Sequence, residues 1–218
     1  MTKPSNEKIV RTLLNDSGLT FAKELGIHVK NNTPSPLFQL LVASLLFSAR
    51  ISSKIAVKGA LALFDQGWTT PRKIAGSTWE ERVKVLNESG YARYDERTST
   101  ILSDTTDFLL ENYDGDLRRL RKEADHDPVR EHRLLTDFKG IGPTGANIFC
   151  REVQVVWSEL YPFADDKTLS EARRLGLPED RYELANLVSK KDFPRLVSAL
   201  IRVGLEKRHD EILEKAKK

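Results

Sequence analysis

Apolar residues recur at helical spacing along nearly the whole chain of 218 residues, and alternation with a period of two is nowhere sustained over five residues. The segment 37–49 is apolar nearly all round, which predicts a helix at the centre of the core. Ser35 and Pro36 precede it and favour a helix start, with Ser35 as the capping residue. The sequence therefore predicts an all-α fold without a sheet.

Two helical segments near residue 140 are joined by a very short turn, in which Gly140 and Gly142 flank Ile141. Glycine lets such a turn reach positive φ, and a turn at a helix start exposes several backbone N–H groups. These groups, together with the positive end of the following helix, favour a phosphate oxygen. The same turn closes many helix pairs for packing alone, so the motif by itself leaves both interpretations open.

An acidic pair, Asp165 and Asp166, follows the hairpin after one helical segment and an aromatic stretch. The pair opens a new helical pattern in which Leu169, Ala172 and Leu175 share one face. Exposed amides at a helix start hold a carboxylate ionised and oriented. One or both acids could also serve only as the helix cap, a role worth ~1 kcal/mol that is compatible with chemistry.

The order of these features, followed by Arg-Leu-Gly-Leu over residues 174–177, resembles the endonuclease III-like DNA glycosylases of the helix-hairpin-helix/Gly-Pro-Asp superfamily. The resemblance covers about residues 36–205 and is most specific over residues 135–177. It implies an all-α, two-lobed helix-hairpin-helix DNA glycosylase fold with a central cleft. One implied lobe, residues 1–36 and 134–218, carries the hairpin and the catalytic aspartate, and the other is the central helical segment 37–133.

The activity that this resemblance implies is base-excision repair, in which the enzyme flips a damaged or mispaired base out of double-stranded DNA and hydrolyses its N-glycosidic bond. The departing base leaves positive charge on the deoxyribose, which a catalytic carboxylate stabilises. The register of the Arg-Leu-Gly-Leu motif assigns this role to Asp165, whereas the alkylbase branch of the family and the position of Leu169 favour Asp166. We favour Asp165. The alternative function is a non-catalytic helix-hairpin-helix protein that recognises damaged or structured DNA.

Bifunctional relatives place a Schiff-base lysine two residues beyond the second hairpin glycine, and this chain has Thr144 at that position. Neither Lys139 nor Lys167 occupies the motif position, so both are interpreted as phosphate contacts or solvated side chains. We therefore expect a monofunctional glycosylase in which AP-lyase activity is weak or absent.

Further DNA contacts follow from the same resemblance. The hairpin residues expected to bind the DNA backbone are Lys139, Gly140, Ile141, Gly142 and Thr144. Arg50 ends the segment 45–50, where relatives have the glutamine that fills the gap left by the flipped base; the alternative is an arginine that satisfies carbonyls at a helix end. Tyr91 and Arg93 lie in a segment resembling the loop that wedges in from the other side.

Three aromatic residues, Trp157, Tyr161 and Phe163, precede the acids. In a glycosylase they could stack on an everted base, although packing in the core is the commoner use of such rings. The charged segment 116–133 is most simply a solvated face, with a phosphate-facing role as the alternative.

Composition limits the remaining possibilities. Cys150 is the only cysteine, so the chain cannot supply the four-cysteine iron–sulfur cluster of many endonuclease III relatives, and we expect it to be a buried apolar filler. The four histidines show no paired metal-ligand spacing, and no cofactor is implied.

With a formal charge of +3, a DNA-binding surface must come from local segregation of charge. No apolar run is long enough to span a membrane, and we expect a cytoplasmic, nucleoid-associated monomer.

Overall fold

The computed structural model describes residues 4–218, and all regular secondary structure within that range is helical. This part of the chain divides into two compact units. The smaller unit contains the described residues up to Glu24 together with Leu160–Lys218, and the larger unit contains Leu25–Glu159. Between residues 4 and 218, no helix combines the length and the apolar character needed to cross a membrane.

The borders of these units differ from the expected division at residues 36/37 and 133/134. The hairpin segment belongs to the larger unit because α10 (Pro143–Val153) packs directly on α3 (Pro34–Ser48). Ala146, Phe149 and Cys150 of α10 are fully buried, which confirms the expected place of the cysteine in the core.

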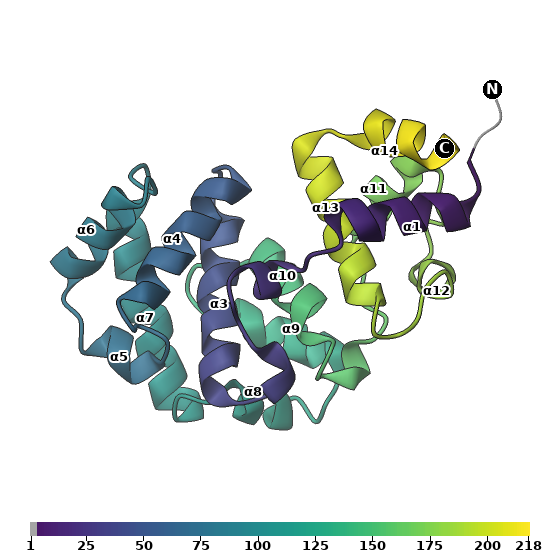
Figure 1. Cartoon of the computed structure of the whole chain (residues 1–218). Helices are drawn as coiled ribbons and strands as arrows, with labels where there is room; N and C mark the ends of the chain where they lie inside the picture. Colours follow the sequence, from purple (N-terminus) through teal and green to yellow (C-terminus); the bar gives the residue numbers. More distant parts are fainter. Residues whose placement is uncertain (1–3) are drawn as a thin grey trace. The chain divides into compact units, whose positions relative to one another are not determined.

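The larger unit is built around α3, which is buried along most of its length, as its apolar sequence predicts. Figure 1 shows α3 between α4 and α10, and both helices contact it. The other helical elements assigned to this unit are η1 (Val29–Asn31), α4 (Ser53–Asp65), α5 (Pro71–Ala75), α6 (Trp79–Glu88), α7 (Asp95–Tyr113), α8 (Leu117–Glu123) and α9 (Pro128–Thr136). The short helix η2 (Ser158–Leu160) lies at its border.

Helix starts in the larger unit follow local side-chain chemistry. Thr78 and Glu81 form a reciprocal capping box at α6: the Glu81 amide donates to Thr78 Oγ1 at 3.1 Å, and the Thr78 amide donates to Glu81 Oε2 at 2.7 Å. The expectation that Ser35 caps α3 is wrong, because the helix begins at Pro34 and its N-cap residue is Thr33. The Ser35 hydroxyl instead donates to the carbonyl of Thr69 at 2.8 Å, a contact 34 residues away in the sequence.

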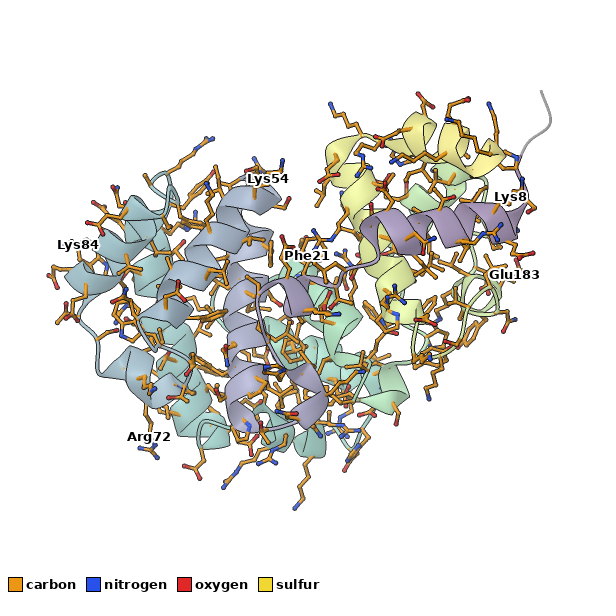
Figure 2. The ribbon with its side chains drawn as sticks, viewed as in Figure 1. Lys8, Phe21, Lys54, Arg72, Lys84 and Glu183 are labelled. Atoms are coloured by element: carbon orange, nitrogen blue, oxygen red, sulfur yellow. The ribbon has the colours of Figure 1, made fainter. Side chains whose placement is uncertain are left out.

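The smaller unit brings together helices from both ends of the described chain. They are α1 (Asn6–Ser17), α2 (Phe21–Glu24), α11 (Asp166–Leu175), α12 (Arg181–Ala185), α13 (Phe193–Glu206) and α14 (His209–Lys217). Figure 1 shows α1, in purple, beside α13 and α14, in yellow, and α1 contacts both. Asp16 of α1 accepts hydrogen bonds from Arg208 and Lys215. Phe21, labelled in Figure 2, lies under the guanidinium of Arg202, with Cζ 4.1 Å from the ring centroid.

A buried carboxyl group lies on α9 in the larger unit. The Glu131 side chain is fully buried, and neither of its carboxyl oxygens receives a hydrogen bond from the described residues. Glu159 receives two hydrogen bonds from Arg121, at 2.5 Å from Nε and 2.7 Å from Nη2. Burial, followed by the influence of Glu159, raises the pKa of Glu131 well above its ordinary value. Burial opposes ionisation of Glu159 as well, but the hydrogen bonds from Arg121 outweigh it and lower that pKa.

We predict that Glu131→Gln changes how stability depends on pH. A raised pKa means that the folded protein retains a proton that the unfolded chain loses above its ordinary pKa of 4.5, so wild-type stability falls as pH rises from there to the folded pKa. The glutamine variant lacks this fall, and the two curves should diverge by up to ~1.4 kcal/mol per pH unit. Urea unfolding between about pH 5 and about pH 9 measures the difference. Glu123→Gln, at an exposed position on α8, is the control, and parallel curves for Glu131→Gln and wild type would contradict the prediction.

Candidate functional site

The hairpin turn joins α9 to α10, and its two glycines have different roles. Gly140 has φ +83°, and a Cβ added to it would lie 2.5 Å from Cγ2 of Ile101 on α7, so both conformation and space require glycine there. Gly142 has φ −83° and ψ −173°, an extended conformation open to any residue, and it is the N-cap residue of α10. Positive φ is therefore confined to the first glycine of the motif.

Ile141 anchors the turn and does not face solvent, since only 1% of its side chain is exposed. Its amide donates to the carbonyl of Phe138 at 3.0 Å. The expectation that Ile141 itself offers a group to DNA is therefore wrong for both its side chain and its N–H. The turn is further fixed from α7, where the Thr105 hydroxyl donates to the carbonyl of Lys139 at 2.9 Å.

The amides on either side of Ile141 remain unpaired. Gly140, Gly142 and Thr144 are exposed, and their N–H groups donate to no acceptor within residues 4–218. The first hydrogen bond of α10 comes from the Ala146 amide, which donates to the carbonyl of Gly142 at 3.0 Å. Pro143 has no N–H, so Gly142 and Thr144 present the available amides at the positive end of this helix. The arrangement provides donors for an anion such as phosphate.

A pocket of about 540 Å³ lies beside the hairpin within the larger unit. It joins the end of α3, the start of α7 and the hairpin itself. The residues lining it are Leu45, Ser48, Ala49, Arg50, Tyr91, Tyr94, Arg97, Thr98, Ile101, Gly140, Gly142, Pro143, Thr144 and Gly145. Five positions expected to contact DNA therefore come together here: Arg50, Tyr91, Gly140, Gly142 and Thr144. The lining contains no aspartate or glutamate, so nothing in its wall opposes an anion.

Arg50 is exposed and forms no hydrogen bond or ion pair with any other residue that the structure describes. The alternative interpretation, in which it satisfies carbonyls at the end of α3, therefore lacks the contact it requires. The end of α3 is closed instead by the Ala49 amide, which donates to the carbonyl of Leu46 at 3.3 Å. The guanidinium of Arg50 is thus available to a partner of the opposite charge.

Tyr91 and Arg93, the two residues expected to wedge into DNA, differ from Arg50 in their surroundings. Tyr91 is only 1% exposed, and its hydroxyl donates to the carbonyl of Leu46 at 3.3 Å, so it is a wall of the pocket and cannot wedge into DNA as it stands. This corrects the expected role of Tyr91. Arg93 is exposed but does not line the pocket; its Cζ lies 5.3 Å from the ring centroid of Tyr94.

The lysine of the hairpin is already paired. Lys139 Nζ lies 2.6 Å from Asp104 Oδ2, so a phosphate would have to compete with that carboxylate. Several cations of the charged segment 116–133 are paired in the same way. Its ion pairs with carboxylates are Arg118–Asp116, Arg119–Asp114, Arg121–Glu159 and Arg130–Asp125. These contacts favour the interpretation of the segment as a charged surface on which most arginines pair with nearby acids.

The acidic pair lies in the smaller unit, at the start of α11. Asp165 is the N-cap residue, half-buried, with Oδ1 accepting hydrogen bonds from the amide of Thr168 at 3.2 Å and from its hydroxyl at 2.6 Å. Asp166 is the first helical residue and is exposed, as is Lys167 after it. The expected helix start at the acids is confirmed, and the capping residue is Asp165.

The Arg-Leu-Gly-Leu motif has a structural role at the other end of the same helix. Gly176 ends α11 with φ +73°, and its amide donates to the carbonyl of Arg173 at 2.8 Å. Leu175 and Leu177 on either side of it are buried in the core of the smaller unit. The motif therefore ends the helix that Asp165 caps.

The three aromatic candidates for a base pocket occupy different environments. Trp157 is completely buried in the larger unit, packed edge-on against Phe149 with ring centroids 5.5 Å apart, and its indole N–H donates to Asn32 Oδ1 at 3.3 Å. It offers no surface to a base, which corrects that assignment. Tyr161 is half-buried against Phe193 in the smaller unit, and Phe163 is also half-buried.

No protein-family model matches this sequence, and a search among curated proteins found no match. Among solved structures, the chain is similar to a non-covalent endonuclease III–DNA complex, with 18% identity and a TM-score of 0.54; the match covers 89% of this chain and 80% of that chain. A trapped endonuclease III–DNA covalent intermediate in an estranged-adenine complex is 22% identical, with a TM-score of 0.49 and coverage of 77% and 73%. The match to the non-covalent complex shows that this chain has the all-α, endonuclease III-like helix-hairpin-helix fold.

The two hairpin glycines should respond differently to alanine. Gly140→Ala forces an alanine to positive φ against Ile101 and should lower the free energy of unfolding by ~1–3 kcal/mol. Gly142→Ala meets nothing within 4 Å and should cost less than ~1 kcal/mol, mainly through the poorer helix cap. Urea unfolding of both variants measures the contrast. Equal losses of unfolding free energy in the two variants would show that the positive φ of Gly140 and its contact with Ile101 do not limit stability.

Proposed function

We propose that this protein is a base-excision DNA glycosylase that binds duplex DNA, everts a damaged or mispaired base and hydrolyses its N-glycosidic bond. The observation that carries the proposal is the pocket of the larger unit, where unpaired hairpin amides and the unpaired Arg50 meet in a wall without acids. The fold supports it, because the similar structure with a TM-score of 0.54 is a non-covalent complex of endonuclease III with DNA. Backbone amides and a guanidinium suit phosphate contacts that position a protein on DNA without reading its sequence.

The chemistry is assigned to Asp165. Loss of the base leaves positive charge on the deoxyribose, and a carboxylate fixed beside it stabilises that charge or activates a water molecule. Asp165 is held by two hydrogen bonds from Thr168 at the start of α11, where the positive end of the helix lies. Asp166 is exposed and lacks this anchoring, so it is the second choice.

The reaction is proposed to be hydrolysis alone. Covalent β-elimination needs an amine that forms a Schiff base with the sugar. The hairpin position of that amine in bifunctional relatives is Thr144 here, an exposed hydroxyl in the first turn of α10 that lines the pocket. Lys139, the neighbouring lysine, is engaged with Asp104.

Asp165→Asn should abolish base release while keeping DNA binding. The amide oxygen of asparagine can still accept from Thr168, so the helix start is retained and only the negative charge is lost. We expect the single-turnover rate to fall by ~10²–10⁴ on the duplex that the wild type cleaves best, chosen from a panel with uracil, oxidised guanine or an alkylated purine. Asp166→Asn is the matched control. A larger loss in the control than in Asp165→Asn would transfer the catalytic role to Asp166.

Borohydride trapping tests the monofunctional assignment. Incubation of the wild type with an abasic duplex and borohydride should give no covalent protein–DNA complex, because Thr144 supplies no amine. A trapped complex that disappears in Lys167→Ala or Lys139→Ala would contradict the assignment and identify the lysine responsible.

A second candidate function is a non-catalytic protein that recognises damaged or structured DNA. Arg50 and Thr144 favour it, since they stand where the resembled family has the glutamine that fills the gap and the lysine that forms the Schiff base. Tight binding to a lesion duplex without base release on any member of the panel would establish this alternative.

A further inference from the structure

A second arginine, which the sequence did not single out, lines the pocket beside the hairpin. Arg97 lies in the first turn of α7, is exposed, and has no hydrogen bond or ion pair with another residue in the described range. Most arginines of the charged segment in the same unit contact a carboxylate, for example Arg118 and Asp116. Arg50 and Arg97 have no such contact within the described residues, and both of them line the same pocket.

Arg97 shares the pocket with other groups of positive or donor character. The first turn of its own helix also holds Asp95 and Glu96, which offset the positive end of the helix dipole, so the pocket and not the helix end makes its position unusual. A second guanidinium and the unpaired amides of the hairpin line the same concavity, and no acid lies in its lining. An anion in the pocket would pair with both guanidiniums and with the hairpin amides.

The lining indicates which anion fits. Its unpaired groups, which are the guanidiniums of Arg50 and Arg97 and the hairpin amides, are hydrogen-bond donors and match phosphate oxygens. The volume of about 540 Å³ exceeds what one phosphate needs and leaves room for the attached sugar and base. Tyr94 also lines the pocket and is half-buried, so its ring offers a face on which a base can stack.

We propose that Arg97 is a DNA-binding residue that, with Arg50 and the hairpin amides, holds one phosphodiester-linked nucleotide of the strand in this pocket. The proposal rests on the proposed function and makes it more specific. It states that the pocket takes one nucleotide of the DNA strand and that two arginines and the hairpin amides hold its phosphate. The contact is to the phosphate, so it is independent of base sequence.

The experiment compares Arg97→Ala with Arg72→Ala in fluorescence-anisotropy titrations of a duplex that carries an uncleavable abasic-site analogue. Arg72 is an exposed arginine on α5 that lies outside the pocket lining and, as Figure 2 shows, projects outward from the larger unit. Both variants lose one positive charge. Arg97→Ala should weaken binding by ~10-fold and reduce the slope of log affinity against log salt by about 1, whereas Arg72→Ala should change affinity less than about 2-fold.

Each other outcome overturns the inference. If Arg97→Ala binds like Arg72→Ala while the wild type binds tightly, Arg97 is not a DNA contact and the proposed glycosylase function stands. If the loss appears only with one base opposite the lesion and the salt slope is unchanged, Arg97 reads a base. If the wild type binds no duplex, the inference and the proposed function both fall. Arg97→Gln, with urea unfolding of both variants, distinguishes lost contact from lost fold.

Discussion

The close approach of the Gly140 backbone to Ile101 sets the geometry on which the pocket depends. No side chain fits between the hairpin and α7 at this point, and the Thr105 hydroxyl ties the adjacent Lys139 carbonyl to the same helix. The packing of α10 on α3 then holds the other side of the turn. Because the turn is fixed from two directions, the amides around the buried Ile141 side chain have a defined orientation before any partner arrives.

Charge is distributed in the larger unit so that the pocket keeps its donors. Arg118 and Arg121 of α8 and Arg130 of α9 contact nearby acids, and Lys139 contacts Asp104. Arg50 and Arg97 form no such ion pair within the described residues, and the pocket wall contains no acid. A modest formal charge of +3 is therefore compatible with a strongly donating site, because carboxylates pair with several basic side chains outside the pocket and with neither arginine in it.

Local rules allowed much of this arrangement to be predicted from the sequence. The helical spacing predicted the all-α fold, and the acids at 165 and 166 marked the start of α11 because a carboxylate caps exposed amides there. The position of Ser35 was misjudged, since its hydroxyl bonds to Thr69 across a distance that no local rule reaches. The burial of Tyr91 differs from its expected role for a related reason, because an aromatic ring near a motif has the same sequence signal whether it faces a pocket or the core. Trp157 is buried in the core, which is the commoner use of such rings. Arg97 escaped notice because its importance comes from its neighbours on other helices.

The hydrogen bonds between Asp165 and Thr168 have a consequence for how this protein can vary. One carboxylate both orders the beginning of α11 and, in the proposed reaction, faces the developing sugar cation. Natural selection for a folded chain and selection for turnover therefore act on the same atom. A lineage that abandoned the chemistry would still keep an aspartate, asparagine, serine or threonine at this position, because those residues are the ones that begin a helix well.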